Sequence, residues 1–250
     1  MTCKLITMSF LAFCLYAQFK WEIINAMCYL TGGAIFIAGS VLFLPKYEEY
    51  LFVGTLLFII GSFLYLFVSG HDLYEVFHAS DPKVVDALAA SSYCAGGILF
   101  IIGSYQFIPS VGAFTAGAYN FVVGSLLFIT GAVINSVQIF DSPTRASAMY
   151  ANFTAVCYVI GSTLFLSGSV PYLWDLESEK DTVTLYRYLG IQFVLGSVLF
   201  FLGGSLNLYR AYLIFLHGLS KSRADFQSRH TADAEFVSEY TRSLERLPGS

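Results

Sequence analysis

Charged residues are scarce in this 250-residue chain: only 12% of its residues are Asp, Glu, Lys or Arg, whereas 56% are hydrophobic. Soluble domains carry about 25% charged residues, because their surface has to face water. A chain with so little charge needs an apolar solvent around it as well as an apolar core. The composition therefore predicts an integral membrane protein whose main partner is the lipid bilayer.

Basic residues and cysteines are also few. The 13 Lys and Arg are outnumbered by 17 Asp and Glu, which gives a net charge of −4. Nucleic-acid binding requires a basic patch, so we expect no nucleic-acid partner. The five cysteines are odd in number and lack C-x-x-C spacing, which argues against a disulfide framework or a zinc site. We expect them to be small apolar packing residues.

Six apolar runs are long enough to cross a hydrocarbon core of about 30 Å, which needs roughly 20 helical residues. They are Ile23–Leu44, Tyr50–Val68, Val84–Ile108, Ala113–Phe140, Ala148–Val170 and Tyr186–His217. The predicted fold class is therefore all-α, a polytopic transmembrane bundle of six spans. No run carries a charged residue near its middle, although proton relays and ion-coupled pumps normally need one.

The two ends of the chain allow more than one interpretation. Residues 1–20 are apolar, and we expect an N-terminal helix that lies at the interface or packs on the bundle. A seventh span and a cleaved signal peptide are the alternatives. Residues 218–250 are polar and fit either an amphipathic cytoplasmic helix or disorder. Alternating spans put ten Lys and Arg on one side against three on the other, which predicts cytoplasmic termini by the positive-inside rule.

A pattern of Gly-x-x-x-Phe-x-x-Gly, followed by a small residue, recurs in every span. Its copies are Gly32, Phe36, Gly39; Gly54, Phe58, Gly61; Gly96, Phe100, Gly103; Gly124, Phe128, Gly131; Gly161, Phe165, Gly168; and Gly196, Phe200, Gly203. On a helical wheel the motif occupies about 120° of one face. Lipid provides no hydrophobic force between helices, so close backbone approach at glycine and packing of phenylalanine are the expected role. A narrow pore lined by Gly and Ser is the alternative.

The repeating unit is a hairpin, because only the first, third and fifth spans have a Tyr three residues before the first Gly. The sequence thus predicts three parallel repeats, at residues 21–80, 81–142 and 143–217, around an axis along the membrane normal. In the second, fourth and sixth spans, the motif aligns Gly54 with Gly124 and Gly196.

The first hairpin combines this motif with further residues, namely Trp21-Glu-Ile-Ile-Asn25, Tyr29, Gly32-Gly33, Gly39-Ser40, Pro45, Tyr47-Glu48 and Gly61-Ser62. In this combination it resembles the YrhK-like domain. The similarity is best over residues 21–78, weaker over 84–141 and loosest over 147–216. The resemblance implies a two-span membrane hairpin and brings no catalytic residue with it.

Two groups of polar residues are candidate sites. His71, Glu75 and His78 lie at i, i+4 and i+7 after the second span, where imidazole and carboxylate groups suit zinc or iron. We expect a solvated helix end there, with a metal site as the alternative. Asn120 and Gln192 share a repeat position and are the candidates for lining a polar cavity, unless they hydrogen-bond between helices.

The chain has no P-loop, H-E-x-x-H, G-x-S-x-G or Rossmann motif, so we expect no enzymatic activity and no cofactor. The preferred function is a structural or assembly component, which associates with its own copies or other membrane proteins through the Gly/Phe/Ser helix faces. The alternative is a channel or carrier for a neutral or weakly charged small solute, with a polar path between the three hairpins.

Overall fold

The computed structural model describes residues 2–81, 83–137, 144–174 and 179–245, and all its regular elements are helices. These elements are α1 (Thr2–Leu42), η1 (Pro45–Tyr50), α2 (Leu51–His78), α3 (Val84–Gln106), α4 (Phe114–Val137), α5 (Arg145–Ser169), η3 (Val170–Leu173) and α6 (Glu179–Glu245). Six stretches are long and apolar enough to cross a membrane: Phe19–Leu42, Pro45–His78, Val84–Gln106, Phe114–Ser136, Arg145–Leu173 and Val183–Ala224. The predicted all-α class and its six span-length helices are therefore confirmed. The predicted end of the fourth span, at Phe140, lies outside the described residues.

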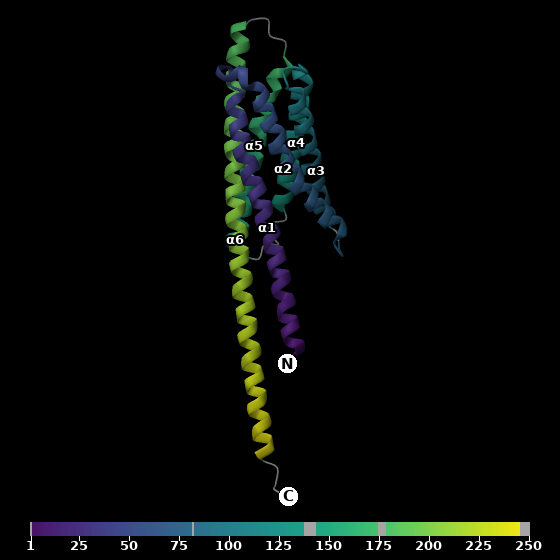
Figure 1. The fold of residues 1–250 in the computed structure, drawn as a ribbon, viewed down its shortest axis with the longest axis vertical. Coiled ribbons are helices and arrows are strands. Elements are labelled where there is room, and N and C mark those ends of the chain that lie inside the picture. The colour runs from purple at the N-terminus through teal and green to yellow at the C-terminus, as the bar shows by residue number, and fades with distance from the viewer. Residues whose placement is uncertain (1, 82, 138–143, 175–178, 246–250) are drawn as a thin grey trace.

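The first and last helices both extend beyond the spans that the sequence predicts. α1 runs from Thr2 to Leu42 without a break, because no Gly or Pro interrupts residues 2–31. The N-terminal segment is thus continuous with the first span and is not a separate helix. α6 continues as a helix to Glu245, well past the predicted end of its span. Figure 1 shows the two extensions projecting from the same end of the bundle.

The six helices form a closed ring in chain order. Each helix packs against the helices before and after it, and α6 closes the ring by packing along α1. The outer surface of the ring is apolar, with large exposed side chains such as Phe52, Ile60, Phe63 and Phe67. Such a surface suits contact with lipid, where exposed apolar side chains carry no cost.

Within each hairpin, glycines of one helix lie against aromatic rings of the other. A Cβ on Gly61 would lie 2.9 Å from the ring of Phe36, and a Cβ on Gly39 would lie 2.8 Å from the ring of Phe58. The same contact joins Gly54 to Phe43, Gly32 to Tyr65, Gly96 to Phe128, Gly103 to Phe121, Gly124 to Phe100, Gly131 to Tyr93, Gly161 to Phe200, Gly168 to Phe193, Gly196 to Phe165 and Gly203 to Tyr158. These pairs bring the helices together by van der Waals packing, as association in lipid requires.

The pairing corrects the register of the repeat in the even-numbered helices. The glycines that face the equivalent Phe side chains of α1, α3 and α5 are Gly61, Gly124 and Gly196. Gly61, and not Gly54, is therefore the counterpart of Gly124. The motif alignment is wrong by seven residues, or two helical turns. The reason is that α4 contains the motif twice, as Gly117-Phe121-Gly124 and as Gly124-Phe128-Gly131, so the sequence leaves two registers open.

The residue after a motif glycine often faces the neighbouring hairpin. At the seam between α1 and α6, a Cβ on Gly33 would lie 2.7 Å from the backbone of Phe201, and one on Gly204 would lie 2.8 Å from the backbone nitrogen of Leu30. The hydroxyl groups of Ser40 and Ser197 also hydrogen-bond across this seam at 2.8 Å. The first and last helices of the chain are thus joined by direct backbone contact.

Aromatic side chains fill the centre of the ring in five sets of three, with one member from each hairpin. The sets are Tyr29, Tyr93, Tyr158; Tyr65, Phe128, Phe200; Phe36, Phe100, Phe165; Phe58, Phe121, Phe193; and Phe43, Phe107, Tyr172. Rings from different hairpins touch, since the centroids of Phe100 and Phe165 are 5.7 Å apart. We call these residues the aromatic column. The glycines face its rings and do not line an open pore.

Candidate functional site

A cavity of about 330 Å³ lies inside the ring, at the end from which α1 and α6 extend. Residues from all six membrane-spanning helices line it. Pockets that hold small ligands have volumes of about 300–1,000 Å³. The cavity is therefore large enough for a compact solute, and the aromatic column closes its inner end.

Nine residues of the cavity wall occupy three equivalent positions of the repeat. From the centre of the bundle outward they are Tyr65, Phe128, Phe200; Tyr29, Tyr93, Tyr158; and Asp72, Asn135, Asn207. In the even-numbered helices the outer residue follows the inner aromatic residue by seven positions in each copy. The cavity therefore lies on the pseudo-threefold axis, and the two inner sets are the first two levels of the aromatic column.

Charged groups break this symmetry. Three residues of the cavity wall are charged: Glu22 of α1, Asp72 of α2 and Arg210 of α6. Arg210 acts electrostatically on Glu22 and donates a hydrogen bond of 3.4 Å to Asn207. Asn207 in turn donates to Asn25 of α1 at 3.5 Å, which links the two helices at the mouth of the cavity.

Asp72 has a different environment from Glu22. The Trp21 side chain hydrogen-bonds its carboxylate, and the charges acting on it include two other carboxylates, Glu22 and Glu75. At the equivalent position, the other two hairpins have the neutral residues Asn135 and Asn207. Asp72 thus places the one acidic group in an otherwise amide-containing polar ring.

Four polar atoms of the cavity wall are buried and lack a hydrogen-bond partner among the described residues. They are Thr154 Oγ1, Tyr158 Oη, Ser162 Oγ and Arg210 Nε. The side chain of Ser162 is 0% exposed and that of Thr154 is 8% exposed. A buried polar group without a partner costs about 1–3 kcal/mol. A water molecule or a polar ligand in the cavity could offset this cost, once these side chains turn toward it.

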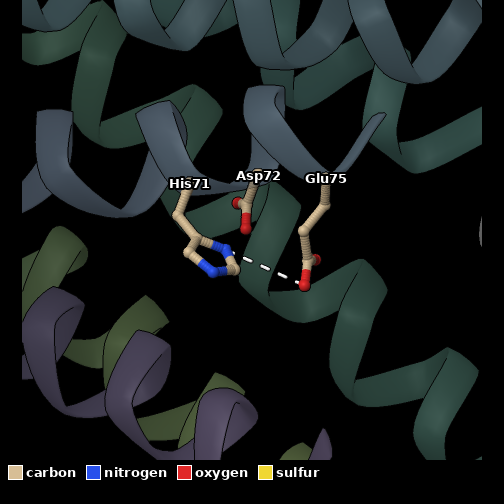
Figure 2. A group of neighbouring side chains, drawn as sticks. All are labelled: His71, Asp72 and Glu75. Carbon is tan, nitrogen blue, oxygen red and sulfur yellow. Dashed lines mark ion pairs between the residues drawn. The ribbon is translucent and has the colours of Figure 1, made fainter. Parts of the chain in front are cut away.

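Three potential metal ligands come together beside the cavity. One ligand atom each from His71, Asp72 and Glu75 lie within 4.8 Å of one another, as Figure 2 shows at the end of α2. His71 Nδ1 is 3.9 Å from Glu75 Oε1, and the His71 ring stacks on Trp21 at 3.4 Å between centroids. The cluster shares His71 and Glu75 with the alternative metal site considered from the sequence, and it contains Asp72 in place of His78.

The predicted set of His71, Glu75 and His78 is not brought together. His78 Nδ1 hydrogen-bonds the carbonyl oxygen of Tyr74 at 2.9 Å, and its ring stacks on the Tyr74 ring. His78, the last residue of α2, has a local partner on its own helix and is not part of the cluster. Asp72, the neighbour of His71, takes its place in the cluster.

Asn120 and Gln192 do not line this cavity. Asn120 Nδ2 donates to Gln106 Oε1 at 2.7 Å, between the two helices of the second hairpin. The Cβ of Gln192 lies 3.1 Å from the position that a Cβ on Gly168 would take. The sequence signal for the cavity is instead the polar residue seven positions after an aromatic residue. The seven-residue error in the repeat register hides it, because the three copies then do not align.

The comparison with known families supports the register of the repeat that the structure shows. The family described as YrhK-like protein matches residues 20–77 and again residues 83–139. The two matches begin 63 residues apart, which is also the interval between Gly61 and Gly124. No curated protein and no solved structure matches the chain. Residues 20–139 therefore match the YrhK-like family as two tandem units, and a third hairpin follows them.

Proposed function

We propose that this multi-pass membrane protein is a non-enzymatic carrier or receptor that binds a small polar solute in the cavity. The observation that carries the proposal is the set of unpartnered buried polar atoms, above all those of Thr154 and Ser162, at a cavity on the pseudo-threefold axis. In hydrocarbon, buried polar groups need partners even more than in a soluble protein. A polar solute would supply them.

The aromatic column supports a binding function over an open channel. Three levels of rings lie beyond the two that line the cavity, and side chains such as Phe58, Phe100 and Phe165 are almost completely buried among them. A solute that enters the cavity meets a packed apolar core. Transport would then require the hairpins to move, as in carriers that alternate between two states.

The assembly function predicted from the sequence receives less support. Its Gly/Phe faces contact each other within the chain, so copies of the protein or other membrane proteins would have to bind elsewhere on the surface. The outer apolar surface is available for this, but it also suits lipid alone. Solute binding therefore explains more of the observed geometry than assembly does.

We propose further that the cavity faces the cytoplasm, because both termini lie at its end and the positive-inside rule favours cytoplasmic termini. In a variant without native cysteines, Ser80→Cys near the cavity end is expected to resist a membrane-impermeant maleimide in intact cells. Glu48→Cys, in η1 between α1 and α2, is expected to react. The opposite labelling pattern would reverse the orientation.

The proposal predicts that a side chain placed in the cavity abolishes solute binding. Ala151 lines the cavity on α5, so Ala151→Phe is expected to remove the stabilisation that a bound polar solute gives. Ala146→Phe is the matched control, because Ala146 is exposed on the same helix. The measurement is the thermal unfolding of the purified protein in maltoside detergent against a panel of polar solutes. Failure of every solute to stabilise the unaltered protein would contradict the proposal.

A further inference from the structure

We infer that the solute is a compact organic cation, a substituted ammonium group held by the Asp72 carboxylate against the tyrosine rings of the cavity. The inference rests on the proposed function and specifies the chemical class of its ligand. Three features carry it: the charges of the wall, its aromatic faces and the one acidic residue in the polar ring.

The charges of the wall leave one carboxylate to be neutralised. The wall holds two carboxylates, Glu22 and Asp72, and one guanidinium group, Arg210, so one carboxylate lacks an opposite charge within the wall. Asp72 has two further carboxylates, Glu22 and Glu75, among the charges that act on it. Burial of a charge without a partner is costly in a medium of low dielectric constant. A monovalent cation at Asp72 would remove this cost.

His71 is the other group near Asp72 that can carry a positive charge. Its Nδ1, however, points to Glu75 at 3.9 Å, and its ring lies flat on Trp21. A positive charge on His71 would therefore be shared by two carboxylates, Glu75 and Asp72, and one negative charge of this group stays available to a solute.

The aromatic faces of the wall suit an ammonium group with alkyl substituents. The ring of Tyr29 meets that of Tyr65 edge to face at 4.7 Å between centroids, and it lies tilted against the ring of Tyr158 at 5.7 Å. A cation over such rings gains about 0.5–2 kcal/mol, and the effect is larger where water is excluded. Methyl groups on the nitrogen would contact the rings, while the unpartnered hydroxyl groups of Thr154 and Ser162 would bind a polar substituent.

An ammonium group can come from a free solute or from a lipid headgroup. A second, shallower pocket lies between α4 and α5 and is lined by Val133, Val156, Ile160 and other small or apolar residues. Ala155 lines both pockets, so the cavity and this groove adjoin at its side chain. The experiment therefore has one arm for each source.

The test is a titration of the full-length protein in maltoside detergent with choline chloride, with 3,3-dimethylbutan-1-ol as its uncharged isostere. We expect saturable binding of choline and at least about tenfold weaker binding of the isostere, which corresponds to about 1.4 kcal/mol. Asp72→Asn is expected to weaken choline binding at least tenfold. It should fold, because Asn occupies the equivalent position in both other hairpins. Asp81→Asn, an exposed residue after the same helix, is the control and should leave affinity unchanged.

The outcomes separate the alternatives. Stronger binding of dihexanoylphosphatidylcholine than of choline, with the same dependence on Asp72, would identify a lipid headgroup and support the inference. Equal binding of the isostere, or choline binding that survives Asp72→Asn, would overturn it. Tight zinc binding at His71, Asp72 and Glu75 that choline does not displace would also overturn it. If another solute still stabilises the protein and Ala151→Phe abolishes that effect, the proposed function stands without this inference.

Discussion

Replacement of Phe165 by alanine is expected to lower the free energy of unfolding by about 3–5 kcal/mol, the cost of truncating a fully buried aromatic side chain. Phe165 is 0% exposed and lies at the middle level of the aromatic column. Its ring contacts those of Phe36, Phe58, Phe100, Phe193 and Phe200. The truncation would leave a void where all three hairpins meet, and lipid cannot reach it.

Phe63→Ala is the matched control for this prediction. Phe63 is 55% exposed on the outer face of α2, where lipid can occupy the space that the ring leaves. We expect a loss of less than about 1 kcal/mol there, because truncation leaves no cavity. Both variants are measured by titrating mixed micelles with sodium dodecyl sulfate and following the loss of helical structure. Equal losses would mean that the column is not the main source of packing energy.

Replacement of Gly204 by alanine is expected to cost about 1–3 kcal/mol, because it overpacks the seam between α1 and α6. The new Cβ would lie 2.8 Å from the nitrogen and 2.9 Å from the Cα of Leu30. Backbone atoms cannot move aside as the end of a side chain can, so the two helices must separate. A single methyl group is thus expected to weaken the closure of the ring.

Gly70→Ala is the control for this substitution, since a Cβ on Gly70 would meet nothing within 4 Å. Alanine favours helix over glycine by up to about 1 kcal/mol, so this variant is expected to be slightly stabilised. Unfolding in mixed micelles gives the free energies. A disulfide between Ser40→Cys and Ser197→Cys reports whether the seam is closed, because these side chains touch in the native protein. Equal effects of the two glycine substitutions would contradict the close contact at Gly204.

The fold could be predicted from the sequence in outline. The length of the apolar runs fixes six span-length helices, and the spacing of Gly and Phe shows that a hairpin is repeated. The ends of the chain were less predictable. Residues 2–20 join the first span because nothing in the sequence stops the helix, and the absence of a stop signal is easily overlooked when apolar runs are counted.

The register of the repeat could not be determined from a single motif. Gly54 and Gly61 both precede an aromatic residue by four positions, so either one can be aligned with Gly124. The contacts of Phe36 decide between them, and those contacts exist only once the hairpin is folded.

The candidate site was predicted least well. Asn120 and Gln192 share a repeat position, as a cavity on a symmetry axis would require, but they lie nearer the other end of the hairpins. Asp72, Asn135 and Asn207 share a position too, although one is an acid and two are amides. Composition alone gives no reason to group them. Helical spacing also grouped His78 with His71 and Glu75, because it takes no account of what each side chain meets.

Closure of the ring by its first and last helices has a consequence for biosynthesis. Ser40 and Ser197 are 157 positions apart, so the partner of the first helix leaves the ribosome after nearly all the rest of the membrane domain. Until then the Gly33 side of α1 has only lipid to face. A chain that is cut short keeps this notch exposed, and the cell's quality control then has a surface by which to recognise an unfinished copy.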